Sequence, residues 1–185
     1  MTVVNTAGMI AAGSPVNLLR NSLVLIKTRA YSADSIISFG QVNNPCISDV
    51  NIYLGNPEGS FKVPAGRYAR DAFTSYGNWG MVDGAANLTY MQTVTAVLNA
   101  VAAASSPTIG AVYITDANAF WVNSPSGVNP VEIIAVAPYS VNETIIYPVA
   151  QINTGANQTA AGLFMTFIQT PAAKKGFLKW GFNLY

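Results

Sequence analysis

The strongest constraint on the fold comes from an uninterrupted apolar run at residues 23–26, Leu-Val-Leu-Ile. Strands with one face in water alternate apolar and polar residues, whereas a continuous apolar run is typical of a strand buried on both faces. Such a strand needs a sheet with other elements packed against each side. We therefore expect a covered sheet.

Strand patterns alternate with helical patterns along the rest of the chain. Short runs rich in Val, Ile or Tyr predict strands at residues 50–54, 109–114, 132–137 and 145–152. Apolar residues three and four positions apart predict helices at residues 66–76, 91–104 and 160–168, and another follows Thr170 as N-cap, with Gly181 just past its end. A short helix is also expected at residues 6–12. This alternation predicts an α/β fold.

Composition excludes several classes of function. Only 9% of the 185 residues are charged, and Lys/Arg and Asp/Glu nearly balance, at nine and eight. Nucleic-acid binding needs a basic stripe, but only Lys174, Lys175 and Lys179 cluster, so no nucleic-acid partner is expected. Histidine, the commonest general acid–base and zinc ligand, is absent, and the acids show no paired spacing. We expect neither an enzyme nor a cation-binding metal site.

Other motifs are equally scarce. Cys46 is the single cysteine, so no intrachain disulfide is possible. No phosphate-binding loop or dinucleotide fingerprint occurs, and no cofactor is expected. The chain has no apolar run long enough for a membrane span, and its first residues lack the charge and apolar core of a signal peptide. We expect a soluble chain without a secretion signal.

Two local features are candidates for ligand binding. Small residues lead directly into a helix at Val63-Pro64-Ala65-Gly66, and free backbone N–H groups at such a helix end bind anions without a charged side chain. Tyr113 ends a predicted strand, where ligands of α/β folds bind. A plain helix start and a core tyrosine are the alternatives, and each is the commoner interpretation taken alone.

Two further interpretations concern packing. Asp116 is expected to cap the helix that follows Tyr113. Four aromatic residues, Phe164, Phe167, Phe177 and Trp180, fall at helical spacing and are expected in the core.

Taken in order, these segments resemble the periplasmic molybdate-binding proteins, the substrate-binding components of molybdate ABC transporters. The resemblance is carried by residues 18–26, 55–58, 63–69, 110–117, 146–150 and 164–182. It implies a two-lobed α/β fold of the periplasmic-binding-protein type II and a tetrahedral oxyanion, molybdate or tungstate, as ligand. It also implies an ABC transporter permease as partner and a periplasmic or extracytoplasmic location.

In that family neutral donors hold the oxyanion between the lobes. Carried over by motif, the donors of the second lobe are the backbone N–H of Ala65, the hydroxyl of Tyr113 and the backbone N–H of Val94. The match at Val94 requires one extra residue between its helix and Tyr113. Helix ends and hydroxyls hold a dianion without Lys, Arg or His, which agrees with the low charge of the chain.

The resemblance also implies a division into parts. Residues 1–27 would be a remnant of the first lobe with a crossover strand, residues 28–144 the complete second lobe, and residues 145–185 the return strand and C-terminal helices of the first lobe. The family's opening block of strands and helices, which supplies two serine hydroxyls to the oxyanion, has no counterpart before Thr6. We therefore expect an incomplete first lobe.

Two expectations follow from an incomplete first lobe. The monomer would bind an oxyanion weakly or not at all, and exposed apolar faces would favour a homodimer or an exchange of terminal elements. A structural or interaction protein that keeps the fold without binding a ligand remains the alternative. The sequence leaves open which oxyanion is bound.

Overall fold

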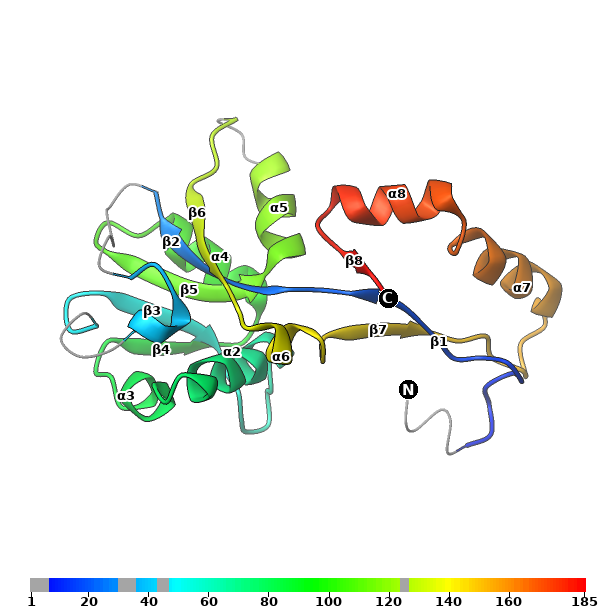
Figure 1. The fold of residues 1–185 in the computed structure, drawn as a ribbon, viewed down its shortest axis with the longest axis horizontal. Helices are drawn as coiled ribbons and strands as arrows, with labels where there is room; N and C mark the ends of the chain where they lie inside the picture. The colour runs from blue at the N-terminus through cyan, green and yellow to red at the C-terminus, as the bar shows by residue number, and fades with distance from the viewer. Residues whose placement is uncertain (1–6, 30–35, 43–46, 124–126) are drawn as a thin grey trace. The chain divides into compact units, whose positions relative to one another are not determined.

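The chain forms two compact units. The computed structural model describes residues 7–29, 36–42, 47–123 and 127–185 (Figure 1). Unit 1 comprises Met1–Asn21 and Glu143–Tyr185, and unit 2 comprises Ser22–Asn142. Residues 22–27, expected together with the first-lobe remnant, lie in unit 2 because their strand pairs on both sides within the sheet of that unit. Cys46 lies outside the described residues.

A five-stranded mixed sheet forms the centre of unit 2, in the order β4-β3-β5-β2-β6. Its strands are β2 (Leu23–Thr28), β3 (Asn51–Gly55), β4 (Leu88–Met91), β5 (Thr108–Tyr113) and β6 (Val131–Val136). β3 is parallel to β4 and β5, whereas β2 is antiparallel to β5 and β6. The apolar run at residues 23–26 is fully buried. This confirms the predicted strand with two covered faces.

The helices of unit 2 are α2 (Pro64–Ser75), α3 (Trp79–Asp83), α4 (Val94–Ala102), α5 (Ile114–Val122) and α6 (Tyr139–Asn142), with a 3-10 turn, η1, at Phe39–Gln41. Of these, α2, α4 and α5 pack on the five-stranded sheet, and the shorter helices of the unit pack on α2. α4 buries Val97, Leu98 and Val101 in the same cluster as Val24 and Val112 of the sheet. The apolar spacing seen in the sequence thus marks the buried face of α4.

Two boundaries in unit 2 differ from the sequence prediction. Met91, expected inside a helix, is the last residue of β4 because it pairs with Gly55 of β3. α4 begins only after Thr93, which caps it. α3 was not expected, since its residues fall in a segment interpreted as a loop.

Unit 1 contains a small antiparallel sheet and two helices (Figure 1). The sheet order is β7-β1-β8, with β1 at Val16–Arg20, β7 at Ile146–Val149 and β8 at Asn183–Leu184. The helices are α7 (Gln158–Phe167) and α8 (Pro171–Lys179). The Thr170 hydroxyl accepts a hydrogen bond from the N–H of Ala173 at 3.3 Å, and Gly181 has a φ of 94°. Both predicted ends of α8 are confirmed.

The helix expected at residues 6–12 is a wrong prediction for residues 7–12. Ile10 pairs with Ile152 as an isolated antiparallel bridge, and the N–H of Ala11 donates to the carbonyl of Gln151 at 2.9 Å. Residues 7, 8 and 12 lie in turns, and the segment between them is not helical because its backbone hydrogen bonds go to residues 151–153, distant in the sequence.

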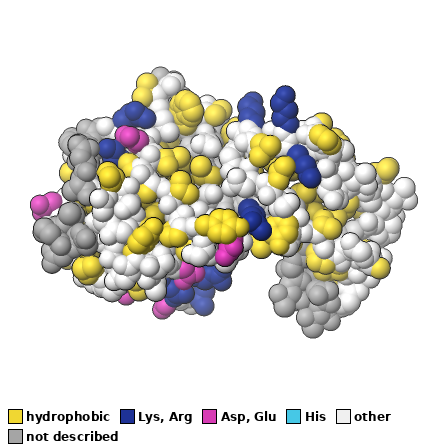
Figure 2. Space-filling view, in the orientation of Figure 1, with side chains coloured by type: hydrophobic (Ala, Val, Ile, Leu, Met, Phe, Trp, Pro, Cys, Tyr) yellow, Lys and Arg dark blue, Asp and Glu magenta, His cyan; other side chains and the backbone are white. Residues whose placement is uncertain are grey.

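Apolar side chains of α7 are exposed rather than buried. Leu163, Phe164 and Phe167 are 68%, 59% and 58% exposed, and Trp180 is 36% exposed. Hydrophobic groups are visible on the surface (Figure 2). The prediction of a core role is therefore wrong for Phe164, Phe167 and Trp180, because helical spacing shows that apolar residues share a face and not that the face is covered. Phe177 packs edge-on against Phe182, with ring centroids 6.2 Å apart.

Within the described part of the chain, no helix has the length and apolar character needed to cross a membrane.

Candidate anion-binding site

Three parallel strands of unit 2 end at one edge of the sheet, and each leads into a helix. Gly55 of β3 lies opposite Met91 of β4, while β3 and β5 pair in parallel through Tyr53 and Gly110. The following helices are α2, α4 and α5. Because helix N-termini carry free N–H groups and partial positive charge, this carboxyl edge is suited to an anion.

The start of α2 is held tightly against the ends of β3 and β4. The N–H of Val63 donates to the carbonyl of Asn56 at 2.8 Å, and the N–H of Asn56 donates to the carbonyl of Met91 at 2.9 Å. A Cβ on Gly66 would overlap the carbonyl oxygen of Gly55. Glycine is therefore required at position 66 for the helix to approach the strand this closely.

Ala65 is the second residue of α2 and is fully buried. The N-cap, Val63, has no side-chain acceptor, and Pro64 has no N–H. The N–H groups of Gly66 and Arg67 donate to the carbonyl of Val63, at 2.9 and 3.4 Å. Ala65 thus contributes a first-turn N–H at a position without an acceptor within the helix. Its role as a ligand donor stays a prediction.

Val94 is the first residue of α4 and is half-buried. The hydroxyl of the N-cap, Thr93, accepts a hydrogen bond from the N–H of Ala96 at 3.0 Å, and the Thr93 carbonyl accepts from Val97 at 3.2 Å. The Val94 side chain packs against the core of unit 2. Capping satisfies the third N–H of the helix, and the Val94 N–H keeps a first-turn position without an acceptor inside the helix.

Tyr113 is the last residue of β5 and the N-cap residue of α5. It pairs with Leu23, and the next N–H, that of Ile114, donates to the carbonyl of Ser22 at 2.9 Å. Its side chain is half-buried, whereas Val112 before it is fully buried. The Tyr113 ring meets that of Tyr68 on α2 edge to face, with centroids 6.3 Å apart.

Charged groups near these strand ends are mostly paired with one another. Arg70 contacts Glu58 at 2.8 Å, and the Tyr90 hydroxyl donates to Asp83. Burial, followed by the hydrogen bond and negative charge of Asp83, raises the pKa of Tyr90. A small pocket of about 110 Å³ is lined by Asn56, Pro57, Glu58, Trp79, Asp83 and Tyr90. Its two carboxylates make this pocket unsuitable for an anion.

The sequence predicted that Asp116 caps α5, and this prediction is wrong. Tyr113 occupies the N-cap position, and Asp116 lies in the first turn of the helix. Burial raises the pKa of the Asp116 carboxyl. The lysine cluster of the sequence lies on α8 in unit 1, so it belongs to a different unit from the three candidate donors. Among the residues described, no three His, Cys, Asp or Glu side chains gather as potential metal ligands.

Two residues of this region were not found from the sequence. The Tyr68 ring contacts Tyr113, and the Cζ atom of Arg67 lies 4.8 Å from the centroid of the Tyr68 ring. The spacing of Tyr68 with Ala69 and Ala72 indicated only a helical face. No local sequence signal identifies the contact between Tyr68 and Tyr113, because the two residues are far apart in the sequence.

Comparison with known proteins shows the family of the chain. Residues 1–183 match the model of the bacterial extracellular solute-binding protein family. The chain belongs to this family. A solute-binding family agrees with the expectation that the chain is not an enzyme.

The curated relatives of this solute-binding protein include two molybdate-binding proteins named ModA. The chain is 30% identical to ModA of Haemophilus influenzae over 167 residues, covering 90% of the chain and 59% of the relative. It is 27% identical to ModA of Escherichia coli over 168 residues, covering 90% and 60%. The resemblance found in the sequence is confirmed. The chain spans about 60% of the length of these relatives.

Solved structures confirm the fold. A substrate-binding domain assigned to a molybdenum ABC transporter of Clostridium difficile has a TM-score of 0.74 at 24% identity, covering 99% of this chain and 72% of that one. The periplasmic molybdate-binding protein of Azotobacter vinelandii has a TM-score of 0.72 at 17% identity, covering 100% and 74%. The α/β fold of the periplasmic-binding-protein type II, matched in part, is therefore shown.

Proposed function

We propose that this solute-binding protein binds a tetrahedral oxyanion of the molybdate or tungstate type and delivers it to the permease of an ABC transporter. The observation that carries the proposal is the meeting of three helix N-termini at the carboxyl edge of β4, β3 and β5. The names of the relatives support it, since two curated relatives are molybdate-binding proteins and a structural neighbour from Desulfovibrio alaskensis is a tungstate-binding protein with a TM-score of 0.61.

Three neutral groups are the proposed ligand donors. They are the N–H of Ala65, the N–H of Val94 and the hydroxyl of Tyr113, from α2, α4 and β5. A hydrogen bond to an ionised group is stronger than one between neutral groups, so a few well-placed donors suffice for a dianion.

The proposed affinity of these 185 residues alone is low. The chain matches about 60% of the length of its curated relatives, and the donors named above all come from unit 2. The three donors do not include any ligand group that a relative supplies from the part of its chain that this sequence does not match. We expect a monomer to bind the oxyanion weakly, and we expect a periplasmic or extracytoplasmic site of action.

Association of chains is the second part of the proposal. The residues of α7, all of them described, include none that is buried, and Leu163, Phe164 and Phe167 form an exposed apolar face. Exposed apolar faces tend to be covered by association. We propose a homodimer or an exchange of terminal elements between chains. The same exposure favours the alternative function, a structural or interaction protein that keeps the fold without a ligand.

Native mass spectrometry of the full chain, with and without molybdate, tests both parts. The proposal predicts a saturable increase by the mass of one oxyanion per site and a dimer at micromolar concentration. Phosphate and sulfate serve as competing oxyanions. A dimer that takes up no oxyanion would favour the interaction protein, and a monomer with sub-micromolar molybdate affinity would contradict both weak binding and association.

A further inference from the structure

We propose that Tyr68 is a positioning residue for the anion site, whose ring, steadied by Arg67, fixes the ring of Tyr113 and thereby the place of the Tyr113 hydroxyl. This inference rests on the proposed function, because it assigns a role in holding one of the three proposed donors. Tyr68 is not itself proposed to touch the ligand.

The contact joins two elements that meet at the carboxyl edge. Tyr68 lies in the second turn of α2, three residues after Ala65, and Tyr113 ends β5. Their rings are inclined at 62° with centroids 6.3 Å apart, which is the edge-to-face arrangement that aromatic pairs prefer. The helix that offers the Ala65 N–H therefore also contacts the side chain of the hydroxyl donor.

A contact with a neighbouring ring helps to fix the place of a tyrosine hydroxyl. The backbone of Tyr113 is fixed by pairing with Leu23, and the place of its half-buried ring is set by the side-chain torsion about the Cα–Cβ bond. The hydroxyl oxygen lies at the far end of the ring, on the Cβ–Cγ axis, so a small rotation about the Cα–Cβ bond displaces it substantially. A neighbouring ring that excludes other rotamers reduces the entropy lost when the ligand binds.

The guanidinium group of Arg67 lies over the Tyr68 ring. The guanidinium carbon lies 4.8 Å from the ring centroid, within the range of a cation–π contact. Arg67 is exposed, and its side chain is not one of the proposed donors. Arg67 contacts Tyr68, and Tyr68 contacts Tyr113. Replacing Arg67 or Tyr68 is therefore expected to change oxyanion binding only through its effect on the Tyr113 hydroxyl.

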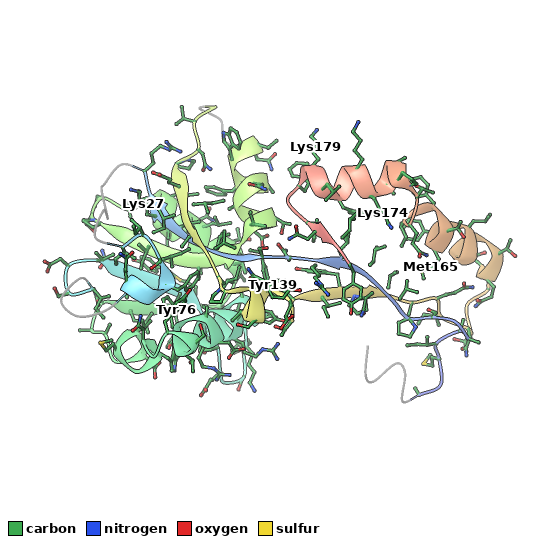
Figure 3. All side chains as sticks on the ribbon, in the orientation of Figure 1. Lys27, Tyr76, Tyr139, Met165, Lys174 and Lys179 are labelled. Atoms are coloured by element: carbon green, nitrogen blue, oxygen red, sulfur yellow. The ribbon has the colours of Figure 1, made fainter. Side chains whose placement is uncertain are left out.

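The test measures molybdate affinity of the full chain by isothermal titration or, if binding is weak, by NMR titration. Tyr68→Leu is expected to weaken binding about fivefold, as a lost aromatic pair implies, and Tyr68→Phe to stay within about twofold because the ring is kept. Tyr76→Leu, at the C-terminal end of the same helix (Figure 3), is the matched control and should bind as wild type.

A double-mutant cycle separates positioning from a general structural effect. In a Tyr113→Phe background there is no hydroxyl to position, so Tyr68→Leu should cause no further loss. Arg67→Gln, which changes an exposed residue and should not impair folding, is expected to weaken binding about twofold with Tyr113 present and not at all without its hydroxyl.

Four results would overturn the inference. Wild-type affinity in Tyr68→Leu, or an equal loss in both backgrounds, would show that Tyr68 does not position the hydroxyl. If Tyr68→Leu does not fold, an equal effect of Arg67→Gln in both backgrounds would have the same meaning. Absence of saturable binding by the wild type at millimolar molybdate would instead overturn the proposed function itself, and this inference with it.

Discussion

The first position of α4 allows a single backbone donor to be removed. Val94→Pro deletes the Val94 N–H, and proline is favourable at the first helical position. The preceding residue, Thr93, has φ −147° and ψ 156°, which a following proline tolerates. We expect oxyanion affinity to fall about tenfold or more, since a hydrogen bond to a charged group is lost. Calorimetric titration measures this.

Val94→Ala is the control for that substitution. It also removes the valine side chain that packs against the core of unit 2, but it keeps the N–H. Reduced thermal stability with nearly unchanged affinity is expected. An equal loss of affinity in the alanine and proline variants would exclude the N–H as a donor.

Asp116 is predicted to make stability depend on pH. Because burial raises the pKa of its carboxyl, the folded state binds a proton more readily than the unfolded state. The associated stability is full below the ordinary aspartate pKa and is lost as pH rises through the raised one. Asp116→Asn should therefore melt at a higher temperature than wild type at about pH 7, and the difference should shrink at about pH 3. Equal melting temperatures at neutral pH would contradict this.

At the scale of elements, glycine allows α2 to approach β3. Gly66→Ala would place a Cβ against the carbonyl of Gly55, and we expect a loss of about 2 to 3 kcal/mol in the free energy of unfolding. Gly80→Ala in α3 meets no atom within 4 Å and is the matched control, with little change or a small gain. Chemical denaturation compares the two. Similar unfolding midpoints in both variants would refute the close approach.

The elements that the sequence predicts well are those with a local signal. The apolar run of β2, the cap of α8 by Thr170 and the apolar face of α4 each depend on neighbours within a few residues. β4 was missed because its pairing with β3 is not local and because Met91 continues the helical spacing of α4. Pairing between distant segments is decided by the whole sheet.

The residues of the candidate site also differ in whether the sequence identifies them. Ala65 and Tyr113 were found because a helix start and a strand end have sequence signatures, and Val94 was placed by resemblance. The contact of Tyr68 with Tyr113 joins residues on α2 and β5 and has no such signature. The part of a site that positions its donors is thus less visible in a sequence than the donors themselves.

At the scale of the whole molecule, the proposed dimer is expected to depend on α7. Phe164→Ser combined with Phe167→Ser replaces two exposed rings that contribute little to the interior of their own chain. We expect the dimer to dissociate to a monomer at micromolar concentration in sedimentation velocity, because apolar contact area is lost. Phe61→Ser removes another ring that is 68% exposed, in unit 2, and should leave the dimer intact. Unchanged association in the α7 variant would place the interface elsewhere.

Charge is also divided between the two units. Unit 1 has four Lys/Arg residues and one acid, a net charge of 4 − 1 = +3, and unit 2 has five and seven, a net charge of 5 − 7 = −2. The proposed oxyanion site therefore lies in the unit with net negative charge. Binding there must come from local N–H and hydroxyl groups, since the net charge of the unit opposes it.

Titration of the ¹⁵N-labelled chain with molybdate, followed by NMR, tests the central claim most directly. If the anion binds at the carboxyl edge of the unit 2 sheet, the amide signals of Ala65 and Val94 will shift saturably and together, and the signals of Lys174, Lys175 and Lys179 will not. Saturable shifts confined to the lysines of α8, or no saturable shift at millimolar molybdate, would contradict the proposed site.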